Sequence, residues 1–250
     1  MPSLDDPGAL ALAALAMFLG GVLKGATGAG SPVVAVPILS LLYSVPFAVT
    51  LFVLPNLLSN LWQGWKYRVH TPRPGFVWSF ALAGGVGAGV GSVMLANLPA
   101  AVLMAGVAVV VLLYITFRLA RPGWRLSPAW GDRLVLPMGA LGGIMQGAGG
   151  ISAPVSVTFL NALRLERPVF IATISVFFAV MSLVQIPTLW SLGLLGPERL
   201  LQSLVAFGVL FAGMPVGEWL ARRITPATFD RLMLALLAVI ALRLLWTALG

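Results

Sequence analysis

Long apolar runs dominate this sequence, and they restrict the chain to a small set of folds. The runs cover residues 9–24, 32–44, 46–65, 75–96, 99–119, 134–148, 154–163, 168–190, 200–221 and 227–249. About 20 apolar residues in an α-helix cross the hydrocarbon core of a bilayer, so most of these runs are long enough to span it. We therefore expect an all-α, polytopic helical bundle in the cell inner (plasma) membrane.

The amino-acid composition excludes a water-soluble fold. Hydrophobic residues make up 60% of the chain and charged residues only 9%, whereas roughly a quarter of the residues in a soluble domain are charged. The net charge of +8 would suggest a nucleic-acid partner in a soluble protein. Here the basic residues lie in short loops between apolar runs, where they orient membrane helices. The predicted partner is thus the lipid bilayer and not nucleic acid.

Two further features bound the chemistry. The chain has no cysteine, which excludes disulfides, thiolate metal sites and cysteine nucleophiles, and we predict no metal and no cofactor. Asp5 and Asp6 precede the first apolar run, where a secretory signal would carry basic residues. We therefore expect the first run to remain in the mature protein.

A glycine-rich stretch occurs twice in the chain. Residues 20–28 read GGVLKGATG, and residues 142–150, which lie 122 positions later, read GGIMQGAGG. The same offset pairs Pro32 with Pro154, Val33 with Val155, Pro46 with Pro168, and Gln63 with Gln185. The correspondence continues into the following run, so it indicates an internal duplication.

Basic loops predict how the two copies lie in the membrane. The basic residues between the runs are Lys66, Arg68, His70 and Arg73, then Arg118, Arg121, Arg125 and Arg133, then Arg164 with Arg167 and Arg222 with Arg223. If all are cytoplasmic, run 46–65 points inward and its counterpart 168–190 points outward. We therefore predict two inverted repeats, residues 1–120 and 134–250, joined by a cytoplasmic basic linker, residues 121–133. Such repeats are common in secondary transporters.

Each repeat is predicted to begin with a helical hairpin, re-entrant or spanning, followed by three spanning helices. The short runs 32–44 and 154–163 would reach only about 20 and 15 Å into a core that is about 30 Å thick. Both follow a glycine-rich break, and we expect the two hairpin tips to meet near the midplane. Irregular backbone at that depth must be buried in protein or face a watery cavity. A substrate site is the natural use of such a cavity.

Lys24 is the only lysine within an apolar run. Placing a cation there costs at least about 2.5 to 3.5 kcal/mol, so it requires an anionic or dipolar partner. One interpretation is an electrostatic anchor for an anionic substrate, and the other is a lysine that snorkels to the cytoplasmic interface. The matching position in the second repeat is Gln146, so any positive charge comes from one half only.

The glycine-rich breaks are candidate binding segments. They can expose backbone N–H groups at a helix start, where anions bind favourably. The candidate residues are Gly25, Thr27, Gly28, Gly30 and Ser31 in the first break and Gly147, Gly149, Gly150 and Ser152 in the second, with the serines as additional hydroxyl donors. The alternative is that these glycines only allow close helix packing.

Polar residues also lie within the third run of each half. Asn56, Asn60 and Gln63 share one helical face, and Thr173, Ser175, Ser182 and Gln185 lie along the counterpart. These faces either line a substrate cavity or form hydrogen bonds between helices. By contrast, we expect the glycines of residues 84–91 to serve helix packing, and we expect Glu218 to pair with Arg222 one turn away, with proton coupling through Glu218 as the alternative.

At the paired glycine motifs the sequence resembles the TauE/SafE family of sulfite exporters. The halves of that family each open with a glycine-rich stretch followed by proline, as in Gly20 to Pro37, and the resemblance covers nearly the whole chain. It implies export of sulfite or organosulfonates, or movement of related small anions.

The resulting hypothesis is a permease, not an enzyme, that works by alternating access. An anion would lie between the two hairpin tips, held by backbone amides, Ser31, Ser152 and Lys24. If transport is coupled to an ion, a proton is the expected partner, and the oligomeric state is open, a homo-oligomer included. The alternatives are an intramembrane enzyme, which requires a nucleophile with a base or a metal cluster, and a non-transporting scaffold, which leaves the hairpins unexplained.

Overall fold

The computed structural model describes residues 6–71, 73–121 and 123–223, together with Ala238, Leu242 and Trp246. All regular structure in this part is helical, which confirms the predicted all-α class. The elements are α1 (Pro7–Thr27), α2 (Ser31–Leu42), α3 (Val45–Lys66), the short 3₁₀ helix η1 (Arg68–His70), α4 (Pro74–Asn97), α5 (Ala100–Ala120), α6 (Pro128–Gly149), α7 (Ala153–Ala162), α8 (Arg167–Ser191) and α9 (Pro197–Leu220). The predicted last run, 227–249, lies outside the described residues except for the three named above.

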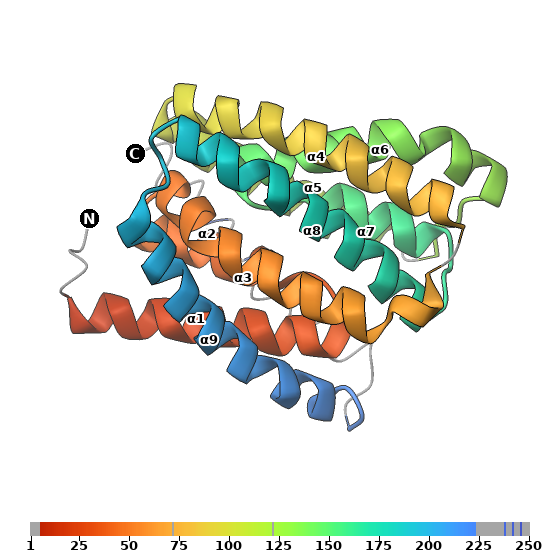
Figure 1. Cartoon of the computed structure of the whole chain (residues 1–250), viewed down its shortest axis with the longest axis horizontal. Coiled ribbons are helices and arrows are strands. Elements are labelled where there is room, and N and C mark those ends of the chain that lie inside the picture. Colours follow the sequence, from red (N-terminus) through yellow and green to blue (C-terminus); the bar gives the residue numbers. More distant parts are fainter. Residues whose placement is uncertain are drawn as a thin grey trace.

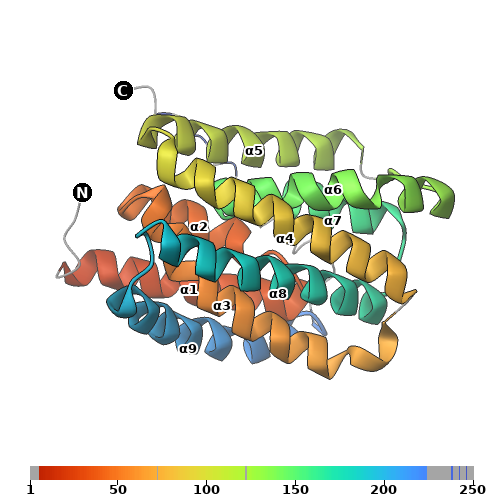
Figure 2. The same cartoon turned by 45° about the horizontal axis from the view of Figure 1, so that its top comes forward.

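Six of the described helices are long and apolar enough to cross a membrane. They are α1, α3, α4, α8 and α9, and α5 from Ala100 to Phe117. As expected from the two short runs, α2 and α7 are too short, with 12 and 10 residues. The long helices lie side by side in one bundle, with α5 alongside α6 (Figures 1 and 2). The chain is therefore a multi-pass membrane protein.

Proline and glycine fix where the helices begin and break. Proline occupies the first turn of each described α-helix except α5, where its fixed φ is compatible with a helix and its missing N–H is not needed. The first break, residues 28–30, has left-handed glycines at both ends, Gly28 with φ 84° and Gly30 with φ 88°. The second break, residues 150–152, begins at Gly150 with φ 72°. Only glycine adopts these angles without a steric penalty, so each helix pair turns back at its glycines.

The helix boundaries reproduce the internal duplication. With the offset of 122 residues, the first residues of α1 to α4 correspond to positions 129, 153, 167 and 196, and α6 to α9 begin at 128, 153, 167 and 197. The equivalent helices α3 and α8 cross in opposite directions, because Asn56 contacts Ser182 while Gly64 lies beside Ser175. Helices α1 and α6 also run in opposite directions in Figure 1. These directions fit the predicted inverted repeats.

Glycines pack the helices closely at two equivalent crossings, α4 on α6 and α1 on α9. A methyl group added to Gly91 would overlap the backbone of Ile144, and one added to Gly143 would overlap the backbone of Gly84. Gly21 and Gly213 make the corresponding contacts between α1 and α9. The prediction that the glycine run of α4 serves helix packing is confirmed.

The prediction that the two hairpin tips meet near the midplane is wrong. Gly28 lies against Ile171, near the start of α8, whereas Gly150 lies against Val49, near the start of α3. Gly64 on α3 lies level with Ser175 on α8, and Ile171 lies one turn further toward the start of α8. The two breaks are therefore separated by at least the 15 residues of α3 from Val49 to Gly64, or about 22 Å. The reason is the length of α1 and α6, which have 21 and 22 residues. Each first arm passes the middle of the bundle before it turns.

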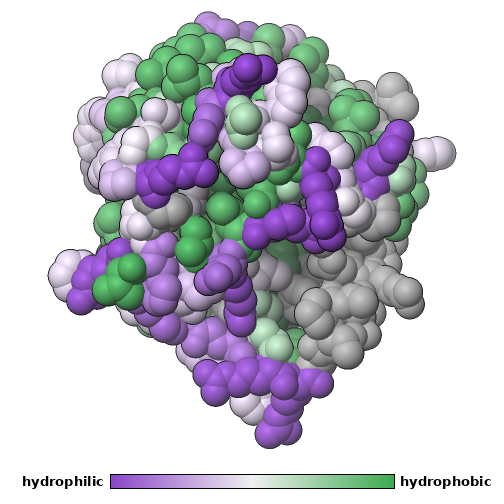
Figure 3. Space-filling model, turned by 90° about the vertical axis from the view of Figure 1, so that its right-hand side faces the viewer, coloured by the Kyte–Doolittle hydropathy of each residue, from purple (hydrophilic) through white to green (hydrophobic). Residues whose placement is uncertain are grey.

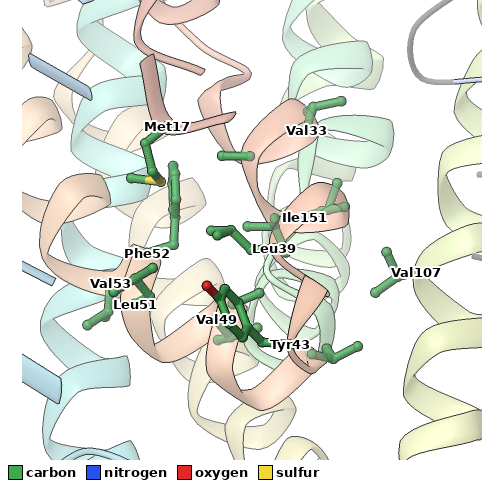
Figure 4. Close-up of a cluster of buried hydrophobic side chains, with 14 of the residues drawn as sticks. Met17, Val33, Leu39, Tyr43, Val49, Leu51, Phe52, Val53, Val107 and Ile151 are labelled. Carbon is green, nitrogen blue, oxygen red and sulfur yellow. The ribbon is translucent and has the colours of Figure 1, made fainter. Parts of the chain in front are cut away.

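Each break inserts into the core of the opposite half. Ile151 lies among Val33 and Leu39 of α2 and Val49 of α3 (Figure 4). Ala29, its counterpart in the first break, belongs to the cluster around Ile171 and other residues of α8. The irregular backbone of both breaks is therefore covered by apolar side chains from the other repeat.

Basic side chains gather at one end of the bundle, which faces the viewer in Figure 3. The exposed basic residues of this end are Lys66, Arg68, Arg73, Arg121, Arg125, Arg133, Arg164, Arg167, Arg222 and Arg223. They lie in the loops and helix ends that the sequence placed in the cytoplasm. We take this end to be the cytoplasmic face.

Candidate functional site

A chain of buried polar side chains crosses the middle of the bundle and joins α1, α3 and α8. The Nζ atom of Lys24 donates to Oδ1 of Asn60 over 2.8 Å. Asn60 Nδ2 donates to the backbone oxygen and to Oδ1 of Asn56, over 2.7 and 2.9 Å. Asn56 Nδ2 then donates to Oγ of Ser182 over 3.0 Å. We call Lys24, Asn60, Asn56 and Ser182 the polar chain.

Lys24 is fully enclosed, with only 1% of its surface exposed. Its position one turn before Gly28 explains how the side chain reaches the centre, because helical side chains lean toward the N-terminus of their helix. The ammonium group therefore points back from the first break toward Asn60. It also lies 5.9 Å from the ring centroid of Phe178 in α8, within reach of a cation–π interaction. The snorkelling interpretation of Lys24 is wrong.

The charge of Lys24 has no carboxylate partner in the part of the chain that the structure describes. The two ion pairs found there, Lys66 with Glu218 and Arg73 with Asp132, are both partly exposed at the basic end. The partners of Lys24 are instead a neutral amide oxygen and an aromatic ring. A buried ammonium without a counterion is costly, so this position is suited to binding an anion.

Within the described part of the chain, several buried polar atoms of the long helices lack a hydrogen-bond partner. Gln63 and Gln185, which match under the duplication, are each 2% exposed, and Gln63 Oε1 and Gln185 Nε2 are unpartnered. Gln146 Oε1, at the position that matches Lys24, is unpartnered too. Such atoms normally bind protein, water or ligand. The structure brings Lys24, Asn56 and Asn60 together, and it does not hydrogen-bond the three glutamines to them.

The hydroxyl groups of the breaks have different surroundings. Thr27 Oγ1 lies 2.8 Å from the oxygen of Leu23 and accepts from the N–H of Ala29 over 3.3 Å, so it stabilises the first break itself. Ser152 Oγ is paired with Ser156 Oγ at 3.0 Å. Ser31 Oγ is buried and has no partner among the residues that the structure describes, which leaves it available to a ligand or water. Ser31 and Ser152 lie in different breaks and do not meet.

The candidate glycines lie against apolar or backbone atoms of neighbouring helices. Gly25 faces the backbone of Met214 in α9, and Gly147 faces the backbone of Ala88 in α4, so both occupy helix crossings. Gly28, Gly30, Gly149 and Gly150 face Ile171, Leu23, Val107 and Val36, respectively. The site proposed below therefore centres on the polar chain and not on these glycines.

Arg167 adds a second cation close to the first break. Its Nη2 atom donates to the backbone oxygen of Ala26 over 2.9 Å. This oxygen belongs to the last turn of α1, where carbonyl groups lack partners within the helix and a cation is favourable. Arg167 thereby fixes the end of α1 against the start of α8.

Sequence reasoning missed one neighbour of Lys24 and misassigned one ion pair. The sequence analysis includes Ser182 on its helix face, and the offset of 122 residues matches it to Asn60. Phe178 carried no signal, because a phenylalanine in an apolar helix is ordinary. Glu218 pairs with Lys66 of α3 over 2.9 Å, not with Arg222; the approach of α3 to α9 brings this cation closer than the one a turn away.

Comparison with known proteins gives one result. A family model described as sulfite exporter TauE/SafE matches residues 13–244. No curated protein and no solved structure matches the chain significantly. The matched region includes both breaks and the whole polar chain.

Proposed function

Since the chain belongs to the sulfite exporter TauE/SafE family, we propose that it exports a small anion, sulfite or an organosulfonate, and that Lys24 supplies the charge that binds it. The family is one of anion-exporting membrane permeases. The chemical identity of the anion, the binding residues and the transport cycle are the parts that we propose.

The observation that carries the proposal is the environment of Lys24. Its ammonium group has three N–H donors, and one of them is used, by Asn60, within the described residues. A sulfite or sulfonate oxygen can accept from the remaining donors while its negative charge neutralises the lysine. Asn60 and Asn56 then orient the ammonium group and do not compete with the anion for its charge.

The crossing of α3 and α8 supports the proposed alternating access. Asn56 and Ser182 meet where these two equivalent helices cross in opposite directions. The first break lies toward one end of the bundle and the second toward the other. If the halves are inverted repeats, rocking one against the other about this crossing opens the polar chain to each side in turn. The starts of α6 to α9 match those of α1 to α4 to within one residue at an offset of 122, and this match supports the interpretation.

The membrane potential favours export. Moving one negative charge from a negative interior to the outside releases about 2.3 kcal/mol per 100 mV. A uniporter can therefore export a monovalent anion without a coupling ion. Proton coupling would instead require a titratable group that exchanges protons during the cycle.

Transport by purified protein in liposomes tests the proposal. Vesicles loaded with labelled sulfite, an alkanesulfonate, sulfate or chloride should release sulfite or the sulfonate faster than protein-free vesicles. Chemical analysis of the released compound separates transport from catalysis, because a permease leaves the compound unchanged. Protein that is correctly inserted but moves none of these anions would contradict the proposed function.

A further inference from the structure

A polar cavity opens at the basic end of the bundle, away from the polar chain. It lies between the end of α5, the following loop and the α7–α8 turn, and its volume is about 340 Å³. Its lining residues are Phe117, Arg121, Trp124, Thr158, Asn161, Ala162, Arg164 and Leu165. None of them belongs to the site proposed for the transported anion.

Among the described residues that line this cavity, the charged side chains are all positive. Arg121 and Arg164 line it without any carboxylate, and neither side chain forms an ion pair or hydrogen bond within the described part of the chain. The neighbouring cavity at the same end is different, because its Arg73 is paired with Asp132 over 2.9 Å. Thr158 and Asn161 add hydrogen-bonding groups. The lining therefore has the chemistry of an anion site whose anion is not supplied by the protein.

The cavity lies at the depth of lipid headgroups. Helix α5 is an apolar candidate span that ends at Ala120, and Arg121 follows it directly. The rings of Phe117 and Trp124 meet edge to face, with centroids 5.2 Å apart, and Trp124 is 40% exposed. Aromatic side chains of this kind concentrate at the membrane–water interface. An anion bound here would lie level with the phosphates of the surrounding lipids.

We propose that this cavity binds the phosphate group of an anionic phospholipid from the cytoplasmic leaflet. Two arginines can bind the phosphate oxygens through charge-assisted hydrogen bonds, and Phe117, Ala162 and Leu165 provide an apolar wall for the adjoining glycerol and acyl carbons. Basic pockets at the ends of membrane helices commonly bind such headgroups. Free phosphate shares the charge of the headgroup but makes no use of the apolar wall. The site is independent of the transported anion.

Lipid binding to purified full-length protein tests the proposal. Protein in a neutral detergent is titrated with phosphatidylglycerol or phosphatidylcholine, and bound lipid is counted by native mass spectrometry. The test variant carries Arg121→Gln and Arg164→Gln. The control variant carries Arg68→Gln and Arg222→Gln, which remove the same charge from the same end but leave the cavity intact.

The wild type and the control should bind phosphatidylglycerol with similar affinity, and the test variant should bind it at least about tenfold more weakly. Phosphatidylcholine should bind all three proteins equally, and thermal unfolding in detergent alone should be unchanged, which excludes a folding defect. Equal weakening in both variants would overturn the proposal, since it would mean that only the total charge matters. Displacement of the lipid by a large excess of inorganic phosphate would also overturn it, in favour of a free-anion site.

Discussion

The Nζ atom of Lys24 in α1 donates a 2.8 Å hydrogen bond to Oδ1 of Asn60 in α3, in a fully buried environment. This bond links the only lysine of the apolar runs to α3, the helix that crosses its equivalent in the second half, α8. It holds the ammonium group inside the bundle, at a level about six residues of α3 from Lys66 at the basic end. The proposed transport mechanism depends on this relationship.

Replacing Asn60 with Asp should inhibit transport by supplying Lys24 with a permanent counterion. The carboxylate is nearly isosteric with the amide and would pair with the ammonium group, so a substrate anion would have to displace it. We expect anion flux in liposomes to fall by at least tenfold, the effect of about 1.5 kcal/mol or more for a hydrogen bond to a charged group. Asn97→Asp, at the exposed end of α4, is the control and should leave flux unchanged. Normal flux in Asn60→Asp would mean that the anion does not bind at Lys24.

The glycine crossing between α1 and α9 should tolerate no side chain. A methyl group at Gly213 overlaps the backbone of Phe18 and Val22, whereas nothing lies within 4 Å of the same position at Gly208 in the same helix. Gly213→Ala should therefore destabilise the protein by about 1 to 3 kcal/mol, the usual effect of overpacking. Gly208→Ala should not. Thermal unfolding in detergent measures both, and equal melting temperatures would show that the helices are not packed this closely.

Single cysteines test the inverted arrangement, because the chain contains none of its own. Asn97 ends α4 and Gly193 follows α8, both opposite the basic end, while His70 and Gly123 lie in the basic loops, and all four positions are exposed. A membrane-impermeant thiol reagent added to intact cells should label cysteines at Asn97 and Gly193 but not at His70 and Gly123. Labelling of all four from one side would contradict the topology.

The driving force of export is a separate prediction. For a uniporter of a monovalent anion, a potential of 100 mV should shift the steady-state ratio of labelled anion across the liposome membrane by about 50-fold, the equivalent of about 2.3 kcal/mol. A pH gradient applied at zero potential should have no such effect. Accumulation driven by the pH gradient would establish proton coupling in place of uniport.

Much of the fold could be predicted from the sequence, because apolar runs and prolines determine membrane helices locally. When 122 is added to the helix starts of the first half, the result agrees with the helix starts of the second half to within one residue. The positions of the breaks along the bundle were harder. Run 9–24 ends at Lys24, but α1 continues to Thr27, and run 134–148 begins six residues after α6 does. These additional turns carry both breaks past the midplane.

The contacts of the site were less predictable than its residues. Lys24, Asn56 and Asn60 were all chosen from the sequence as polar groups in apolar helices. Their partners depend on which helix faces cross, and the relevant residues are far apart in the chain, 36 positions for Lys24 and Asn60 and 126 for Asn56 and Ser182. The same holds for Lys66 and Glu218, which are 152 positions apart. Periodicity within one helix does not contain this information.

The most direct test of the account is anion flux through Lys24→Gln in liposomes, measured beside Lys66→Gln. The first change removes the buried charge and introduces glutamine, the residue type found at the matching position of the second half, Gln146. The second removes a lysine that is already paired with Glu218 at the basic end. Lys24→Gln should fold normally and lose at least about 100-fold of its sulfite or sulfonate flux, the equivalent of about 2.7 kcal/mol or more, while Lys66→Gln should retain nearly all of it. Undiminished flux in Lys24→Gln would contradict the claim that Lys24 binds the transported anion.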